Sequence, residues 1–189
     1  MEPGRLVLLS LVERHGTLLR TAIRRLGSAY RLQPVHVQAL MYLQQANRYS
    51  NTTQALTEFL GLTKGTVSQS VMLLSRKRLI ERYMDESDRR IVRLSLSAKG
   101  ERLLLELQLA LDWQAATREI SPARLKSATR VLRDTLHILQ TVNGGRSFGN
   151  CHNCDYYQKE GLRIYRCGFT GERLSAAETY KICRLHLPA

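Results

Sequence analysis

The middle of the chain constrains the fold most, because its hydrophobic period changes from helical to extended within one short segment. Two helical patterns, over about 53–60 and 64–77, are separated by a turn that contains Gly61. A helix, a short glycine-containing turn and a second helix form the signature of a helix-turn-helix. Two strand patterns follow, over 80–84 and 91–96, and a charged turn joins them. The segment therefore predicts a helix-turn-helix followed directly by a β-hairpin.

Long helical patterns flank this segment on both sides. Apolar residues recur at the helical period over 6–26, and Pro34 suits the first turn of a second helix. After the hairpin, Ser97 is expected to cap a long helix to about Arg118, and Ser121 followed by Pro to begin the last one. The fold class predicted is mainly α, an α+β winged helix with a helical dimerisation region and a small C-terminal metal-stabilised segment.

The charge of the chain points to an acidic partner. Its 29 Lys and Arg residues outnumber 16 Asp and Glu residues, which gives a net charge of +13. Most of the excess lies before Asn150, since only 6 basic and 4 acidic residues follow from there. A strongly basic chain favours nucleic acid as the partner. No apolar run approaches the ~20 residues of a membrane-spanning helix, and we see no secretory signal, so a cytoplasmic, reducing location is expected.

The second helix of the helix-turn-helix offers a face for reading DNA. Val67, Val71 and Leu74 are spaced so that they share one face, which we expect to be buried. The opposite face would enter the major groove, where Gln69 can pair with an adenine edge. Arginines at the hairpin tip would suit a narrow minor groove. The residues predicted to bind DNA are Lys64, Gly65, Thr66, Ser68, Gln69, Arg76, Arg89 and Arg90.

Other charged residues nearby have different expected roles. Asp88 is expected to orient an arginine of the tip rather than touch DNA. Lys77, Arg78 and Arg82 are expected, with Arg76, to contact phosphates, which adds affinity without sequence preference.

The hairpin turn carries a resemblance to a known family. The run Asp85-Glu86-Ser87-Asp88-Arg89-Arg90, followed at 94–100 by Leu-Ser-Leu-Ser-Ala-Lys-Gly, is similar to the wing pattern of MarR-family transcriptional regulators. The run from Leu62 to Arg82 is similar to the family's recognition helix and its exit, with Arg78 where the family usually has Gly. The resemblance covers about residues 5–143. It implies a homodimer, joined through the terminal helices, that binds a pseudo-palindromic operator in double-stranded DNA.

All four cysteines lie in the last part of the chain, spaced Cys151-x2-Cys154-x12-Cys167-x15-Cys183. In a reducing compartment such a cluster favours a metal site over disulfides. Four thiolates suit an iron–sulfur cluster or tetrahedral Zn²⁺. The single Cys-x2-Cys followed by scattered cysteines fits a cluster somewhat better, whereas a Cys183/His186 knuckle would favour zinc. Thiol–disulfide switching is the third alternative.

The sequence thus predicts three parts: a winged-helix and dimerisation domain over 1–143, with the helix-turn-helix and wing at about 52–96, a linker over 144–149, and a Cys-rich tail over 150–189. We expect a sequence-specific regulator rather than an enzyme, since no phosphate loop, carboxylate pair or nucleophile–base set is present. The alternatives are a small redox protein with a docking domain and a non-specific nucleic-acid binder. The operator, the effector, the sign of regulation and the metal are left open.

Overall fold

The computed structural model describes residues 2–144 and 146–189; Met1 and Gly145, the latter in the predicted linker, lie outside the described residues. The helices are α1 (Pro3–Ala29), α2 (Pro34–Gln45), α3 (Thr53–Leu60), α4 (Lys64–Arg76), α5 (Ala98–Leu111), α6 (Trp113–Thr117) and α7 (Pro122–Val142). The strands are β1 (Ile80–Met84), β2 (Val92–Leu96), β3 (Tyr157–Lys159), β4 (Tyr165–Cys167) and β5 (Arg173–Leu174), with short 3-10 turns η1 (Cys151–Asn153) and η2 (Glu178–Tyr180).

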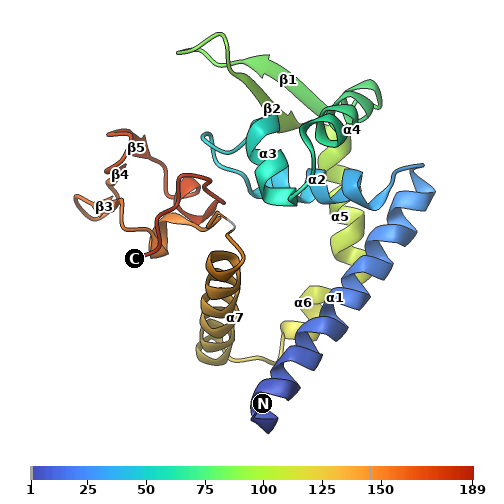
Figure 1. Ribbon diagram of the computed structural model, residues 1–189, viewed down its shortest axis with the longest axis vertical. Coiled ribbons are helices and arrows are strands. Elements are labelled where there is room, and N and C mark those ends of the chain that lie inside the picture. The colour runs from blue at the N-terminus through green and yellow to red at the C-terminus, as the bar shows by residue number, and fades with distance from the viewer. Residues whose placement is uncertain (1, 145) are drawn as a thin grey trace.

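These elements form a winged-helix unit with helical extensions and a small tail. Helices α2, α3 and α4 pack together beside the β1–β2 hairpin, which projects beyond them (Figure 1). Helices α1 and α5 pack against α2 and extend away from the unit, and α6 continues from α5. Helix α7 returns toward the unit, and the tail lies at its end (Figure 1). The predicted class, a mainly α winged helix, is confirmed.

Short polar signals set the helix boundaries of the helix-turn-helix. Thr52 accepts a hydrogen bond from the Ala55 amide at 3.2 Å, and Thr63 accepts one from the Thr66 amide at the same distance. Gly61 ends α3 with φ +63°, a left-handed conformation that glycine adopts without a Cβ clash. Both helices begin within a residue of where the sequence places them, because these caps are local.

The hairpin is held against the helices at its base. Its antiparallel register pairs Ile80 with Leu96 and Met84 with Val92. Leu79 and Leu94 are almost fully buried, so the predicted inward face of the second strand is confirmed there. Helix α5 then crosses close to the strand, and a Cβ on Gly100 would overlap the Leu79 carbonyl oxygen.

One predicted helix is wrong in its extent. The helix that Ser97 caps was expected to continue to about Arg118, but α5 ends at Leu111 and a separate short helix, α6, follows. Asp112 stands between them with φ +44°, and its amide bonds back to the Leu109 carbonyl at 3.1 Å. The hydrophobic period runs across this break, which is why periodicity does not reveal it.

The described part of the predicted linker is not a free tether. Phe148 packs edge-to-face on Phe59, with ring centroids 5.2 Å apart, and also contacts the hydrophobic core. The Cys183 amide donates to the Gly149 carbonyl at 2.7 Å, which pairs the linker with the tail. Residues 146–149 therefore connect α7 and the tail through fixed contacts.

Three helices present apolar faces that nothing covers in a single chain. Helix α7 has no buried residue, and α1 buries only Ile23 and Gly27. The exposed large apolar residues include Leu6, Leu9, Leu11 and Val12 on α1, Leu105 and Leu109 on α5, and Leu132, Leu136 and Leu139 on α7. Contiguous apolar surface of this kind marks an association surface. None of the described helices combines the length and apolar character needed to cross a bilayer.

Candidate DNA interface and cysteine site

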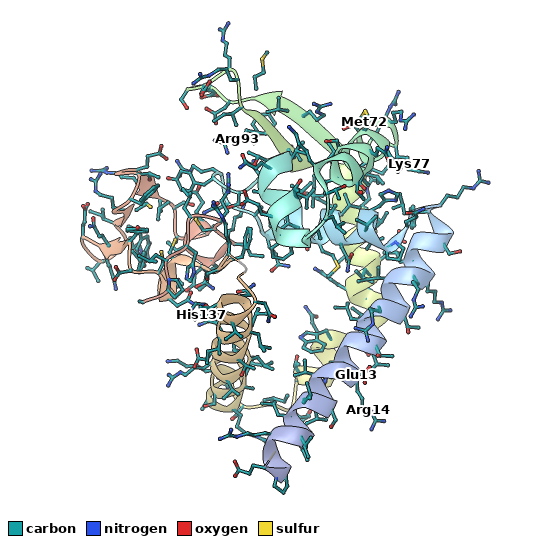
Figure 2. The ribbon with its side chains drawn as sticks, viewed as in Figure 1. Glu13, Arg14, Met72, Lys77, Arg93 and His137 are labelled. Carbon is teal, nitrogen blue, oxygen red and sulfur yellow. The ribbon has the colours of Figure 1, made fainter. Side chains whose placement is uncertain are left out.

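Helix α4 divides into the two faces that the sequence predicts. Val67 and Leu74 are fully buried and Val71 is 3% exposed. On the other side the predicted DNA-binding residues Lys64, Gly65, Thr66, Gln69 and Arg76 are all exposed, and Ser68 is half-buried at the flank. Met72, which is 50% exposed, adds an apolar contact to the same side, and Figure 2 shows it projecting from α4. The predicted division into a buried and a free face is confirmed, and DNA contact by the free face stays a prediction.

The tip of the hairpin presents one free and one oriented arginine. Asp88 accepts two hydrogen bonds from the Arg90 guanidinium, each at 3.0 Å, and one from the Arg90 amide at 3.0 Å. These bonds hold the pKa of Asp88 below its ordinary value and raise the pKa of Arg90. Arg89 is exposed beside them. The expected role of Asp88, orienting an arginine, is confirmed by this geometry.

A second arginine–carboxylate pair lies where the strands enter the turn of the hairpin. Arg93 contacts Asp85 at 2.7 Å, and both side chains are about 15% exposed. Asp85 also accepts hydrogen bonds from the hydroxyl and amide of Ser87 and from the Arg93 side chain, and these lower its pKa far below the ordinary range. Arg93 further donates to the Arg48 carbonyl and to Asn51. Figure 2 shows Arg93 beside the hairpin, on the side of the tail.

Two of the expected phosphate contacts differ from the rest. The Lys77 ammonium donates to the Tyr30 carbonyl at 3.2 Å, so this residue ties α4 to α1 and is only half-exposed. Arg78 adopts φ +58°, the left-handed conformation that explains why glycine suits this turn. The turn is thus made with an arginine at a conformational cost. Arg76 and Arg82 remain exposed on the interface side.

The backbone of the tail brings the four cysteines together. Cys154 donates from its amide to the Cys151 carbonyl at 3.1 Å, which closes the turn between the first two. Strand β3 pairs Tyr157 with Cys167, and Cys183 pairs with Gly149, two residues before Cys151. Three segments that are separated in the sequence therefore bring the four cysteines to one small region of the tail.

The four cysteines form no disulfides, and their thiols influence one another's pKa. Burial, with a smaller contribution from the neighbouring thiols of Cys183, Cys154 and Cys167, raises the pKa of Cys151 to about 11. Burial also raises the pKa of Cys183, while donation from the Asn47 side chain and the Leu185 amide to its sulfur opposes that rise. N–H donors aimed at a sulfur stabilise a thiolate, which is the form that binds metal.

Aromatic side chains surround this region. Tyr157 stacks on Tyr165 with centroids 6.0 Å apart, and His152 contacts Tyr157 at 5.4 Å and Tyr180 at 4.4 Å. His186 does not pair with Cys183 as a metal-binding knuckle in this arrangement. Its Nδ1 contacts the Ser147 hydroxyl at 2.7 Å, and its Nε2 lies 2.8 Å from the Asn153 carbonyl. Both ring nitrogens are therefore occupied.

The thiols have not converged on a single point. Among the residues that the structure describes, no three Cys, His, Asp or Glu side chains are close enough to hold one metal ion. With Zn–S bonds of about 2.3 Å, tetrahedral zinc places its sulfurs about 3.8 Å apart. A zinc site here requires the thiols to move together, whereas in a cluster each thiolate can bind a different iron atom.

The tail is docked on the loop that joins α2 to α3, residues 46–52. Ile182 adds a short parallel bridge, donating to the Gln45 carbonyl at 2.7 Å and accepting from the Asn47 amide at 2.9 Å. The Arg184 amide donates to the Ser50 hydroxyl at 2.8 Å. The Arg184 guanidinium holds both carboxylate oxygens of Glu58, at 2.7 and 3.0 Å.

A second set of contacts joins the same loop to the outer part of the tail. Arg48 donates twice to Glu178 at 2.6 Å and once to Glu172 at 3.3 Å, and Tyr49 contacts Glu172 at 2.7 Å. The Arg48 guanidinium lowers the pKa of Glu178 to about 2. Because Arg93 also bonds to residues 48 and 51, this loop contacts both the tail and the wing.

Sequence analysis missed the residues that make these contacts. Asn47, Arg48, Arg184 and Glu58 carry no local pattern that marks them, and their partners lie more than a hundred residues away along the chain in the case of Arg48 and Arg184. Arg93 lies on the polar side of an alternating strand pattern, and that pattern gives no sign that the loop covers it. The one available signal was the nearly balanced charge from Asn150 onward, where 4 acidic residues accompany 6 basic ones in an otherwise strongly basic chain.

Comparison with known proteins agrees with this geometry. A model of the MarR family matches residues 32–91, which contain the helix-turn-helix and the wing up to its tip. The chain has the MarR winged-helix fold. A mutant of MepR from a multidrug-resistant Staphylococcus aureus clinical isolate superposes with a TM-score of 0.60 at 22% identity, covering 74% of this chain and 100% of MepR.

Two other MarR-fold structures give the same result. The S. aureus MepR–DNA complex aligns with a TM-score of 0.52 at 21% identity, over 70% of this chain and 94% of MepR. A MarR-family transcriptional regulator from Silicibacter pomeroyi aligns with a TM-score of 0.54 at 20% identity, over 67% and 85% of the two chains. No curated protein sequence matches the chain significantly. At these identities the likeness concerns the fold.

Proposed function

We propose that this protein is a sequence-specific, DNA-binding transcriptional regulator, rather than an enzyme, and that it works in the reducing cytosol. The observation that carries the proposal is the free face of α4, on which Lys64, Gln69 and Arg76 are exposed. Beside it lies the wing, where Asp88 accepts hydrogen bonds from Arg90. A related fold, that of MepR, is known in complex with DNA. Phosphate contacts supply affinity, and Gln69 supplies base discrimination.

The regulator acts as a homodimer. The apolar faces of α1, α5 and α7 need a partner, and a second copy presents the same faces. Two recognition helices related by a two-fold axis match half-sites about 34–36 Å apart. Leu139→Arg on α7 should convert the dimer to monomer in sedimentation velocity, with Arg124→Leu on the same helix as a control that adds no charge.

Selection from a random DNA pool tests the proposal. The full chain should enrich a pseudo-palindrome whose half-sites lie about one helical turn apart. Enrichment of no motif would support a non-specific nucleic-acid binder instead. The Gln69→Ala variant should enrich sequences with a weaker base preference at one position of each half-site. Its binding free energy for the wild-type site should be less favourable by about 1–3 kcal/mol.

We further propose that Cys151, Cys154, Cys167 and Cys183 bind an iron–sulfur cluster, with Zn²⁺ as the alternative. The backbone pairings that gather the four cysteines in one region, the polar groups that oppose the rise in the pKa of Cys183 and the surrounding aromatic rings support a thiolate site. Bound metal would add folding free energy to a tail that has little apolar core of its own.

The visible spectrum of anaerobically purified protein, with metal and sulfide analysis, separates the two metals. A brown sample with iron and acid-labile sulfide supports the cluster, and a colourless sample with about one zinc per chain supports zinc. Protein that is metal-free from cells grown with both metals contradicts the metal site and leaves thiol–disulfide exchange.

The docking contacts offer a way for the tail to sense metal or redox state. The Asn47 amide donates to the carbonyl of Ile182, the residue before Cys183, at 2.9 Å, and the same loop receives Arg93 from the wing. A change at the thiols can therefore bias the wing through residues 46–52. Operator affinity of wild type and Cys154→Ser, each before and after chelation or oxidation, tests this. Equal affinity of the wild type in both conditions means that the tail is structural.

A further inference from the structure

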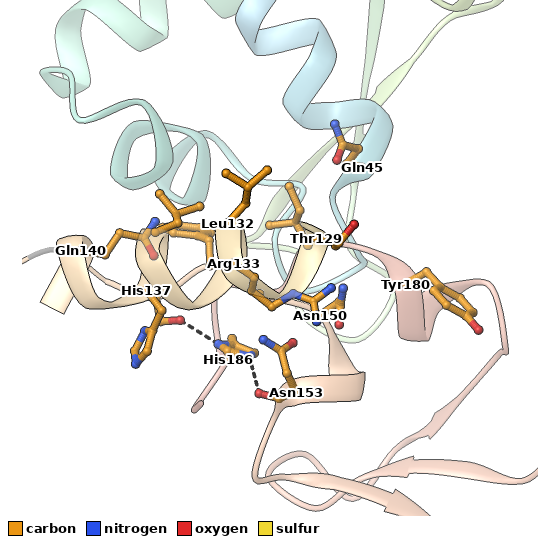
Figure 3. Close-up of a pocket in the computed structure, with 15 residues that line it drawn as sticks. Gln45, Thr129, Leu132, Arg133, His137, Gln140, Asn150, Asn153, Tyr180 and His186 are labelled. Atoms are coloured by element: carbon orange, nitrogen blue, oxygen red, sulfur yellow. Dashed lines mark hydrogen bonds between the residues drawn. The ribbon is translucent and has the colours of Figure 1, made fainter. Parts of the chain in front are cut away.

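The tail carries a small β-sheet on the side that faces away from the helices. Strands β3, β4 and β5 form this sheet, in that order. Helix α7 lies against the other side of the tail, where Figure 3 shows Arg133 extending toward Asn150. In Figure 1 the sheet lies at the outer edge of the molecule, beneath the wing and on the flank to which the wing tip points. The sheet is therefore separate from the helical faces that we assign to the second copy.

The register of the sheet sorts its side chains onto two faces. Alternation places Cys167 of β4 and the buried Leu174 of β5 on the face turned to the cysteine site. Gln158, Arg166 and Arg173 pair with one another across the three strands, so they share the opposite face. Gln158 and Arg173 are exposed there, and Arg166 is half-buried. This second face is polar and is here called the polar face of the tail sheet.

Two arginines, Arg166 and Arg173, stand directly opposite each other on the polar face. Like charges in that position destabilise a sheet, and a nearby anion removes the cost. Glu160 supplies one carboxylate, which contacts Arg166 at 2.6 Å and whose pKa is lowered by that contact. Arg173 is in no ion pair with any residue that the structure describes. The pair therefore has one positive charge that the chain does not balance.

Two further cations lie at the hairpin end of the same sheet. Lys159 is the last residue of β3, and Arg163 lies in the turn that leads to β4. Both are exposed, and within residues 2–144 and 146–189 neither is in an ion pair. Asp155 is exposed as well, but it precedes the other end of β3. A cluster of free cations of this kind favours a polyanion as the partner.

The polar face continues the surface of the wing. The Arg48 guanidinium donates to the Arg173 carbonyl at 3.1 Å, and the Arg48 carbonyl accepts from Arg93 of β2. Contacts therefore run from the wing through one residue of the docking loop to β5. Arg48 also contacts Glu172 and Glu178, which turns these carboxylates toward the loop and away from the free cations.

We propose that the polar face of the tail sheet binds the phosphates of DNA that flanks the operator, beyond the wing. Duplex DNA that leaves the operator past the wing runs along the flank on which the sheet lies (Figure 1). Arg173, Lys159 and Arg163 contact its phosphates, and Gln158 adds an uncharged donor. Such contacts raise affinity for any flanking sequence. The inference rests on the proposed function and deepens it, because it gives the tail a direct contact with DNA.

The test compares a trimmed operator with an extended one. Hydroxyl-radical footprinting of the full-length variant Lys159→Gln/Arg163→Gln/Arg173→Gln defines the base pairs that the rest of the protein contacts, and the trimmed duplex ends there. Ten base pairs of arbitrary sequence, about 34 Å, extend each end. Wild type should bind the extended duplex at least about tenfold more tightly, since about six exposed ion pairs are added per dimer. The slope of log affinity against log salt should become steeper by about 5.

Two full-length variants serve as controls. The triple variant of the sheet should lose the gain on extension and keep wild-type affinity for the trimmed operator. Protection of its Ile182 amide from hydrogen exchange shows that its tail is still docked. The matched variant Arg118→Gln/Arg124→Gln/Lys126→Gln removes the same charge where α6 leads into α7, at the end of the molecule remote from the wing (Figure 1). It should keep the full gain.

Equal affinity of wild type for the trimmed and extended operators overturns the proposal and leaves an acidic protein as the partner of the polar face. A gain that the triple variant retains also overturns it. So does a gain that both triple variants lose equally, because that is an effect of net charge alone. If wild type does not prefer the trimmed operator to a scrambled duplex, the proposed function itself fails, and the flanking contact fails with it.

Discussion

The ion pair between Arg184 and Glu58 offers the sharpest test of tail docking. The Arg184 guanidinium donates to both carboxylate oxygens, and the two side chains are 17% and 23% exposed. Hydrogen bonds to charged groups contribute about 1.5–3 kcal/mol each when buried. The Arg184 Nε atom is buried without a partner, which offsets part of this. We therefore expect Arg184→Met, which removes the pair, to weaken docking of the tail by about 1.5 kcal/mol.

Hydrogen exchange reports this directly, because the Ile182 amide bonds to the Gln45 carbonyl only while the tail is docked. A loss of about 1.4 kcal/mol makes opening tenfold more frequent, so this amide should exchange about tenfold faster in Arg184→Met. Arg20→Met, which removes a pair with Glu13 in which both side chains are more than half exposed, should leave the Ile182 rate unchanged. Unchanged Ile182 exchange in Arg184→Met, or equal acceleration in the control, would refute the docking contacts.

Three further predictions concern stability. Gly100→Ala should destabilise the protein by about 1–3 kcal/mol in denaturant unfolding, since the added methyl meets the Leu79 carbonyl; an unchanged midpoint contradicts this packing. Arg78→Gly should stabilise by about 1 kcal/mol, because φ is +58° there, and a destabilised variant would mean that the turn differs. Arg48 depresses the pKa of Glu178 to about 2, so this carboxylate contributes stability above its ordinary pKa and loses it as the pH falls toward 2. The difference in the free energy of unfolding between wild type and Glu178→Gln should be largest at pH 6 and shrink below about pH 4.5. A difference that does not change with pH would show that the ion pair does not stabilise the fold.

Local signals predicted the DNA-binding half of the molecule closely. The cap at Ser97 and the glycine turn at Gly61 act within three or four residues, so they are visible in the sequence. The alternation of β2 then placed Leu94 inward, where it is 1% exposed. These features depend on hydrogen bonds and on residue alternation within short segments, so each can be predicted from its own segment alone.

Long-range contacts limited what the sequence could predict. The break at Asp112 depends on one backbone conformation within a continuous hydrophobic pattern. Nothing in the alternating pattern of its strand shows that residues 46–52 pack over Arg93. The glycines of the linker suggested a loose tether, yet Phe148 packs on Phe59. In each case the deciding partner lies far away in the sequence.

The cysteine cluster lies between these cases. Its spacing predicted that Cys151, Cys154, Cys167 and Cys183 gather, and the backbone pairing of β3 with β4 and of Cys183 with Gly149 brings them together. Spacing did not predict that the Asn47 amide, from the winged-helix unit, would donate to the Ile182 carbonyl beside Cys183. That contact depends on docking, and it gives the tail a direct connection to the loop beside the wing.

The central claim is that the free face of α4 recognises a DNA sequence, and the ratio of affinities for the selected operator and a scrambled duplex tests it most directly. Measured for the full-length dimer at 150 mM salt, this ratio should be at least about 10³ for wild type. It should fall about tenfold or more in Gln69→Ala, since a lost bidentate base contact costs about 1–3 kcal/mol. Equal affinity for both duplexes, with the same salt dependence, would contradict the account and make the protein a non-specific nucleic-acid binder.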